Sequence, residues 1–485
     1  MSRARGRAGT VCVGPSGSWR LAVSNPHGEP SLADLRTLLQ QMLQCPNCLT
    51  PRSCFRAEAM KDRNGVVIFP REEIFRNTGP HEAWLKKNVV LPTATPPAAR
   101  QPGYFASDMK PLFRVYRLLG IFPINMKDSG YAEFRLLCPL MLYTVFVQAS
   151  MMVAAAFLAK DRLEYITKEN PNFGQVLTEA RYLVSVLYIF LWAVANLPES
   201  GIKAQFISSW TDYQRQYKAA VGKPLDLNLR QQMKTEALFI IVLSSVETAF
   251  MFFSLDKIKL WYTIPISYCV LSCVLNTGLW RGTGLALVTA ARSLIGDLEQ
   301  VLGMCEFECA EKIAEYRMLW LKLGKLTQDL GNCMGFTYGT QVIGYFFEQV
   351  MAVFGLLANM EEGFSSSNIG FVSDVIIFSW LIFVTCNTAQ RATDEVGRHV
   401  QERLQVLFHK FPRRCSESRQ EVRYFLEAIA ENPPQINFSG FVVVNRGLQT
   451  SLMSAMVTYL VILIQFQISV DSAVNKNVTG EKREK

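Results

Sequence analysis

A stretch of 24 residues without a single charge, residues 447–470, constrains this chain more than any other feature. It reads GLQTSLMSAMVTYLVILIQFQISV. A helix needs about 20 predominantly apolar residues to cross the hydrocarbon core of a bilayer. The sequence therefore predicts a transmembrane helix at this point.

The same stretch carries one narrow polar face. On a helix that turns about 100° per residue, five polar side chains fall within roughly 60° of one another, and Ile462 lies in the same stripe. The polar members are Ser451, Ser454, Thr458, Gln465 and Ser469. Two interpretations of this face remain open: packing against a neighbouring helix, which small and hydroxyl side chains favour, or the lining of a water-filled path for ions.

Composition extends the membrane interpretation to the whole chain. Of its 485 residues, 49% are hydrophobic and 19% are charged, and the mean hydropathy is +0.13. An ordinary soluble domain carries about 25% charged residues. A net charge of +9 would suit a nucleic-acid-binding protein, but the Lys and Arg residues lie mainly in loops between apolar runs, where membrane topology places them. We therefore expect lipid, and no nucleic acid, as a partner.

Seven apolar runs predict an all-α membrane protein with seven transmembrane helices. The runs are residues 136–158, 182–197, 237–255, 260–280, 335–360, 369–388 and 447–470. Because proline lacks an N–H group, we expect Pro198 to end the second helix and Pro265 to kink the fourth.

The distribution of Lys and Arg predicts the orientation. Loops on one side of the predicted spans carry 21 of these residues, against ten on the other side together with the C-terminal tail. The positive-inside rule then places the N-terminus in the cytoplasm. Residues 471–485 would form a short extracellular tail.

Residues 1–105 differ from the rest in composition. They are rich in Pro, Gly, Ser and Arg, which predicts a mostly disordered cytoplasmic tail. Cys45, Cys48 and Cys54 resemble half a zinc site, but no convincing fourth ligand follows at the usual spacing. We expect no metal and no cofactor.

The long inner loops have the apolar periodicity of helices. In residues 281–334 and 389–446, apolar side chains repeat every three or four positions between charged ones, for example at Leu287, Leu294, Leu298, Val396, Val400 and Leu404. The sequence predicts helical extensions that reach roughly 30 Å beyond the bilayer, at 1.5 Å per residue. They would bury their apolar stripes together as an anchor domain, whose last helix ends before Pro433.

Three ionisable residues fall inside predicted spans: Glu247, Glu348 and Asp374. Such groups are costly in lipid and are candidates for a ligand pocket or a cation path, although bonds between helices would also explain them. Six aromatic or polar residues could line a pocket with them or act as packing residues: Trp192, Tyr262, Tyr268, Asn276, Tyr345 and Trp380. No phosphate-binding loop, GxSxG motif or metal-ligand spacing is present, so we do not expect an enzyme.

A motif in the terminal helix resembles a known family. Thr458-Tyr459, five apolar residues and Gln465-Phe466 match the TYhhhhhQF signature of insect gustatory receptors. The resemblance implies a tetrameric, ligand-gated cation channel in the plasma membrane of sensory neurons, either homomeric or formed with related subunits. It also implies that the terminal helix lines the pore and is constricted at Gln465 and Phe466, with Ile462 and Ser469 on the same stripe.

The ligand class is less constrained. The block INFSGFVVVNRGLQTSLMSAMVTYLVILIQFQIS and the segment LFRVYRLLGIFPI are similar to the carbon-dioxide receptor branch. The sugar-receptor branch usually has Glu after the TY pair, where this chain has Leu460. Receptors for bitter or sugar tastants remain alternatives. A metabotropic receptor would need the opposite orientation, and a transporter using Glu348 would be favoured by inverted repeats.

Overall fold

The computed structural model describes residues 12–13, 19–20, 104–168, 173–254, 260–304, 309–360, 366–410 and 416–481. The chain divides into two compact units, residues 1–96 and 97–485. Two short antiparallel strands, β1 (Cys12–Val13) and β2 (Trp19–Arg20), are described in the first unit. The remainder of the predicted tail, with Cys45, Cys48 and Cys54, lies outside the described residues.

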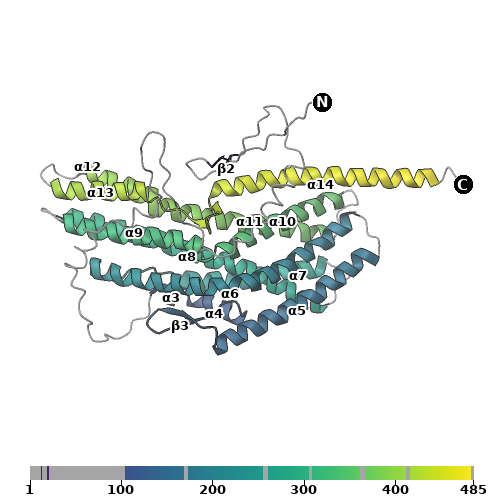
Figure 1. Cartoon of the computed structure of the whole chain (residues 1–485), viewed down its shortest axis with the longest axis horizontal. Coiled ribbons are helices and arrows are strands. Elements are labelled where there is room, and N and C mark those ends of the chain that lie inside the picture. Colours follow the sequence, from purple (N-terminus) through teal and green to yellow (C-terminus); the bar gives the residue numbers. More distant parts are fainter. Residues whose placement is uncertain are drawn as a thin grey trace, which may run out of the picture. The chain divides into compact units, whose positions relative to one another are not determined.

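The second unit is nearly all helical (Figure 1). Its helices are α3 (Tyr104–Asp108), α4 (Lys110–Leu118), α5 (Pro139–Lys168), α6 (Phe173–Val221), α7 (Arg230–Ser254), α8 (Thr263–Met304), α9 (Ala310–Cys333), α10 (Gly335–Met360), α11 (Ser366–Asp394), α12 (Val400–Lys410), α13 (Ser416–Glu431) and α14 (Arg446–Glu481). A 3-10 turn (Leu260–Tyr262) precedes α8, and a π-helical turn (Glu395–His399) joins α11 to α12. Two antiparallel hairpins, β3 (Ile124–Met126) with β4 (Ala132–Phe134) and β5 (Asn437–Phe438) with β6 (Val442–Val443), complete the unit.

The predicted fold class is confirmed. Among the described residues, six helices are long and apolar enough to cross a membrane: α5, α6, α8, α10, α11 and α14. Helix α7 carries the remaining predicted span. The orientation of the termini stays a prediction, because it rests on the distribution of charge.

Both predictions about proline are wrong. Pro198 lies inside α6, which continues to Val221. One missing N–H group removes a single bond from a long helix, and membrane helices tolerate this where neighbouring groups pack around the site. Pro265 is the third residue of α8. The N–H groups of a first helical turn have no partner within the helix, so proline costs little there and causes no kink.

The apolar stripes of the helical extensions are buried as predicted. All six side chains named for them, from Leu287 to Leu404, are buried. The indole of Trp320 on α9 donates a hydrogen bond to the Val396 carbonyl at 2.7 Å and so joins two of the extensions. Helix α13 ends at Glu431, before Pro433. Helix α6 also continues beyond its predicted span, to Val221, which the apolar run did not predict.

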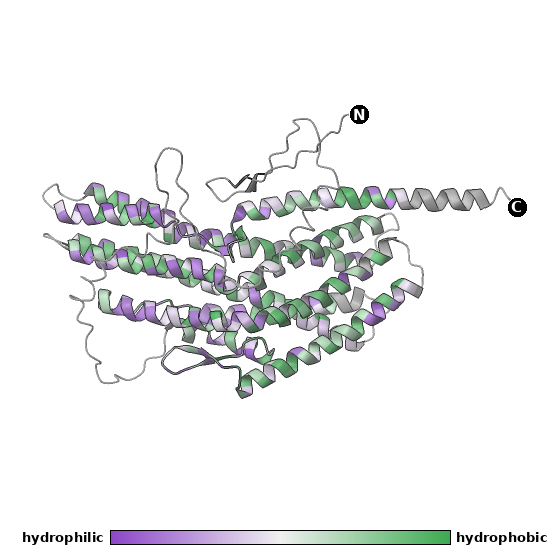
Figure 2. Cartoon of the chain, in the orientation of Figure 1, coloured by the Kyte–Doolittle hydropathy of each residue, from purple (hydrophilic) through white to green (hydrophobic). Residues whose placement is uncertain are grey.

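Hydropathy divides the long helices along their length. Figure 2 shows hydrophilic residues interspersed along α9, α12 and α13, whereas α10 and the middle of α14 are largely hydrophobic. The apolar portions are the predicted membrane spans, and the mixed portions are the predicted anchor domain. This division follows from the solvent that each portion meets.

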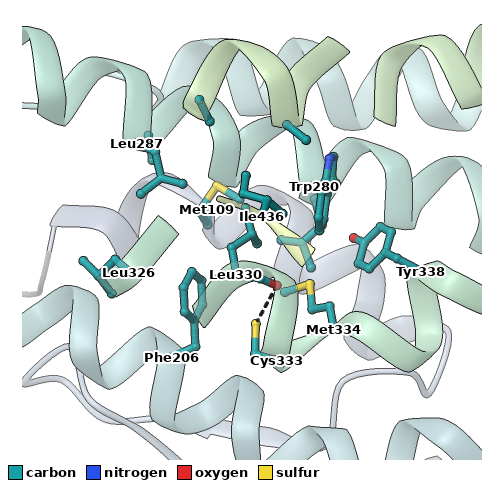
Figure 3. Packing of buried hydrophobic residues seen from close by; sticks show 14 of the residues in the cluster. Met109, Phe206, Trp280, Leu287, Leu326, Leu330, Cys333, Met334, Tyr338 and Ile436 are labelled. Atoms are coloured by element: carbon teal, nitrogen blue, oxygen red, sulfur yellow. Dashed lines mark hydrogen bonds between the residues drawn. The ribbon is translucent and has the colours of Figure 1, made fainter. Parts of the chain in front are cut away.

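The predicted membrane spans and the predicted anchor domain meet at a dense core around Trp280, Leu330 and Ile436 (Figure 3). The ring of Trp280 lies 4.7 Å from that of Tyr338 between centroids. A Cβ atom at Gly331 would lie 2.2 Å from the backbone oxygen of Asn437 on β5. Only glycine therefore lets the β5–β6 hairpin approach α9 this closely, and the hairpin leads directly into α14.

Candidate functional site

Two of the predicted ionisable residues meet an arginine inside the helix bundle. The guanidinium of Arg181 on α6 is in direct contact with the carboxylate of Asp374 on α11. Its Nε atom lies 3.6 Å from Oε2 of Glu348 on α10. All three side chains are buried. The arginine offsets the cost of burying these carboxylates.

The third predicted acid lies in the same cluster. Glu247 on α7 is buried, accepts a hydrogen bond from the Ser373 hydroxyl at 2.6 Å, and lies within electrostatic reach of Arg181 and Asp374. The Arg181 guanidinium also lies 5.6 Å from the centroid of the Phe371 ring, an arrangement that stabilises a cation. One arginine thus ties together acids from three helices.

A small pocket adjoins this cluster between α6, α8, α10 and α11. Most of its lining is apolar, and it leaves about 40 Å³ for the centres of water-sized molecules. Because a single water molecule needs at least about 10–15 Å³ by this measure, the pocket suits a few waters or one small ligand. The lining residues include Ser185, Tyr188, Cys269, Cys273, Gln341, Gly344, Tyr345, Glu348, Phe378 and Leu381.

One wall of the pocket is a hydrogen-bonded network. The Tyr345 hydroxyl donates to the Cys273 carbonyl at 3.0 Å and contacts the Gln341 amide. Asn276 donates to Gln341 at 3.1 Å and accepts from the Tyr116 hydroxyl on α4 at 2.7 Å. A fully bonded network of this kind holds its side chains in fixed positions.

Tyr188 differs from that wall. Its side chain lines the pocket and is 7% exposed, and its hydroxyl, which lies beside Cys273, has no oxygen or nitrogen hydrogen-bond partner among the described residues. The Trp192 ring packs 5.9 Å from the Tyr188 ring and 6.3 Å from that of Tyr268. A thiol is only a weak hydrogen-bond acceptor, so a ligand oxygen in the pocket would offer this buried hydroxyl a stronger partner.

The structure brings most of the predicted pocket residues together. Glu348 and Tyr345 line the pocket itself. Glu247, Asp374, Trp192, Tyr268 and Asn276 form the layer of side chains behind it. Tyr262 and Trp380 lie elsewhere: Tyr262 packs on Trp261 with ring centroids 4.0 Å apart, and Trp380 packs on Phe239 at 5.8 Å. The roles of all these residues stay predictions.

Ser185 and Tyr188 line the pocket and Arg181 contacts Glu348 in its wall, but none of these three was among the predicted site residues. Arg181, Ser185, Tyr188 and Trp192 follow one another at spacings of four, three and four residues, which places them on one face of α6. The apolar run began at residue 182, and although we expected the helix to extend further toward the N-terminus, the arginine was not counted in the span. A helical projection begun one turn earlier would have found this face.

Helix α14 has little burial within its own chain. Only 6% of its most apolar 18-residue segment is buried. The corresponding share for α5, the next lowest of the six candidate spans, is 22%. Every member of the polar stripe is exposed, including Ile462 at 52%. The hydroxyls of Ser451, Thr458 and Ser469 donate hydrogen bonds to backbone carbonyls four residues earlier in α14. These donors therefore need no acceptor on a second helix.

The stripe of α14 points away from the rest of the chain. Leu448 and Leu452 pack against the core, and Tyr459 packs on Phe346 of α10 with ring centroids 5.9 Å apart. On a helical projection the stripe lies roughly 100° from these three contacts. No packing among the described residues covers this polar face. A second chain or water would have to contact it.

Comparison with known proteins decides the family. The sequence profile described as 7tm chemosensory receptor matches residues 109–470. The chain belongs to this family. Its relatives include gustatory and odorant receptor 24 of Anopheles gambiae, which is 30% identical over 84% of this chain and 89% of its own length. Gustatory and odorant receptor 21a of Drosophila melanogaster is 26% identical over 75% of this chain and 81% of its own length.

Solved structures support the fold of this chemosensory receptor. The insect olfactory receptor OR5 of Machilis hrabei matches with a TM-score of 0.51 at 13% identity, covering 74% of this chain and 97% of that one. The complex of OR5 with eugenol matches equally well at 12% identity. The predicted membership of the insect gustatory and odorant receptors is confirmed, and this chain is a multi-pass membrane receptor.

Proposed function

We propose that this receptor chain is one subunit of a ligand-gated cation channel, in which α14 helices from four copies or related subunits surround a central pore. The observation that carries the proposal is the polar stripe of α14, which is exposed along its whole length and turned away from its own chain. Fourfold assembly would bring four such stripes together, and hydrated cations would pass between them.

The stripe contains the elements of a gate. A ring of Ile462 side chains would close the path by excluding water. One turn further along, a ring of Gln465 amides would contact passing ions, with Phe466 at the edge of the same constriction. Thr458 and Ser469 would line the path on either side, because their hydroxyl oxygens stay accessible while their protons are donated to the backbone.

The ligand we propose is a small neutral molecule, with carbon dioxide as the first candidate. The pocket leaves about 40 Å³ for the centres of water-sized molecules, its lining is mostly apolar, and the Tyr188 hydroxyl, which lies beside the Cys273 thiol, could donate to a ligand oxygen instead. The likeness of the terminal block to the carbon-dioxide receptor branch supports the same ligand. The eugenol complex of the Machilis receptor keeps small organic tastants as the alternative.

Currents recorded from cells that express the full chain test this proposal. The chain is expressed alone and with related subunits, and carbon dioxide (at constant pH), sugars and bitter compounds are applied. We expect an inward cation current whose ion selectivity changes in Gln465→Ala and Phe466→Ala. Ile464→Ala is the matched control, because Ile464 is exposed on α14 but lies off the stripe. Unchanged selectivity in both pore variants would count against α14 as the pore.

The orientation has its own test. From the distribution of Lys and Arg, we propose that the N-terminus lies in the cytoplasm. From the family, we propose that the receptor lies in the plasma membrane of sensory neurons. An epitope at the N-terminus should be stained only after the cells are permeabilised, and one at the C-terminus should be stained on intact cells. The opposite result would favour a metabotropic receptor.

A further inference from the structure

A second groove lies between α7, α8 and α11, and it shares no residue with the ligand pocket. It leaves about 410 Å³ for the centres of water-sized molecules. Most of its lining surface is apolar, and the lining also includes two arginines and two amide side chains. The lining consists of Gln232, Arg281, Gly284, Leu285, Val288, Trp380, Val384, Asn387, Thr388 and Arg391.

The charge at this groove is predominantly positive. Arg281 pairs with Glu236 on α7. Arg391 is exposed, and the acid within its electrostatic reach, Glu395, is paired with Arg292. Arg446, also exposed, donates hydrogen bonds of 2.7 and 3.2 Å to the oxygen of Asn387 in the groove lining. The groove therefore has three guanidinium groups at or beside it, those of Arg281, Arg391 and Arg446. Of these, Arg281 is paired with a carboxylate, that of Glu236.

The arginines share one level along the helices. Arg281 directly follows the apolar run of α8, Arg391 follows that of α11, and Arg446 directly precedes that of α14. Trp380 and Val384 lie on the apolar side of this level, about three and two turns before Arg391 on α11. The groove therefore runs from the charged boundary of the membrane into its hydrocarbon layer.

We propose that this groove binds an anionic phospholipid from the leaflet on the arginine-rich side. Its phosphate would accept hydrogen bonds from Arg281 and Arg391, and one acyl chain would lie along Trp380 and Val384. Guanidinium groups bind phosphate oxygens in pairs, and basic grooves between membrane helices take anionic headgroups. A bound phosphate would also face Arg446, the first residue of α14, which links the lipid to the start of the terminal helix.

Lipid retention by the full chain tests this inference without any current being recorded. The purified receptor is reconstituted in phosphatidylcholine bilayers with or without phosphatidylserine, extracted, and analysed for bound lipid by native mass spectrometry. We expect the double variant Arg281→Gln/Arg391→Gln to retain about thirtyfold less phosphatidylserine, since each of the two arginines near an anionic surface contributes about 1 kcal/mol. Arg398→Gln is the matched control, because Arg398 is an exposed arginine two turns beyond Arg391.

A second variant tests the apolar part of the groove. Val384→Trp keeps every arginine but fills the space assigned to the acyl chain, and we expect it to reduce retention as well. Equal retention of phosphatidylserine by the double variant and by Arg398→Gln, with unchanged size-exclusion elution, would overturn the inference. Complete displacement of the lipid by inorganic phosphate would also overturn it, because the groove would then be a site for free anions. A disulfide between two copies of the Val384→Cys variant would overturn it as well, because the groove would then be a contact between subunits.

Discussion

Arg181 on α6 and Asp374 on α11 form a direct ion pair inside the apolar layer of this receptor. The pair lies beside Glu348 and within reach of Glu247, so one guanidinium compensates a group of acids that come from three helices. Its removal would leave buried charge without a counter-ion, which is among the most destabilising changes known for a folded protein.

Replacement of this arginine should therefore destabilise the receptor strongly. We expect Arg181→Met to lower the free energy of unfolding by about 3–5 kcal/mol, seen as an earlier melting transition in detergent. Asp374→Asn should cost less, because Glu348 still pairs with the arginine. If Arg181→Met melts with the wild type, the ion pair does not stabilise the bundle.

The Tyr188 hydroxyl should affect ligand response rather than stability. It has no oxygen or nitrogen hydrogen-bond partner among the described residues, so Tyr188→Phe should change the free energy of unfolding by less than about 0.5 kcal/mol. The half-maximal ligand concentration should rise about fivefold, which corresponds to one lost hydrogen bond of about 1 kcal/mol. The control is Tyr345→Phe, which breaks a network and should lower the melting temperature. An unchanged dose–response curve for Tyr188→Phe would place the ligand elsewhere.

The proposed hydrophobic gate should leak when its ring is made polar. Four Gln side chains at position 462 would hold water in the constriction, so Ile462→Gln should give a current in the absence of ligand. The same substitution at Ile464, exposed but off the stripe, is the control. A basal current of the same size in both variants would show that the effect is not specific to the stripe.

Close packing of α8 on α11 should depend on a glycine. A Cβ atom at Gly284 would lie 2.3 Å from Cγ2 of Thr388, so Gly284→Ala should destabilise the protein by about 1–3 kcal/mol. Thr388→Ser removes the methyl group that clashes, and the double variant should recover most of the loss. Thermal melts of the four proteins measure this coupling, and strict additivity of the two changes would contradict the predicted contact.

One carboxylate outside the membrane spans should make stability depend on pH. Burial raises the pKa of Asp108, although its carboxylate accepts a hydrogen bond from the Leu229 N–H at 3.1 Å. Because the folded state holds this proton more tightly than the unfolded state, the stabilisation is complete below the usual Asp pKa and is lost as pH rises through the folded value. Asp108→Asn keeps an acceptor oxygen without the charge.

We expect Asp108→Asn to be more stable than the wild type at pH 7 by roughly 0.5–1 kcal/mol. The two proteins should converge in acid, where the wild-type carboxyl is protonated. Melting temperatures measured across mildly acid to neutral pH in detergent test this. A difference that stays constant over that range would mean that the substitution acts through packing rather than through charge.

Apolar periodicity predicted the helical spans and the buried stripes of the extensions, because each face of a helix records the solvent or neighbour that it meets. It failed at Pro198, where the packing around α6 outweighs the loss of one backbone bond. It also began a span at residue 182 and so left out Arg181, which neutralises acids on other helices. Helix ends and charge partners depend on neighbours that are distant in the sequence.

The sequence by itself determined the membrane class, the seven apolar runs and the polar stripe of the terminal helix, since all three are periodic patterns within one segment. Only the tertiary structure decided that Glu348, Asp374 and Arg181 meet, and that the α14 stripe is turned away from its own chain. The physical reason is that a local pattern fixes which face of a helix is polar, whereas packing among several helices fixes what that face meets.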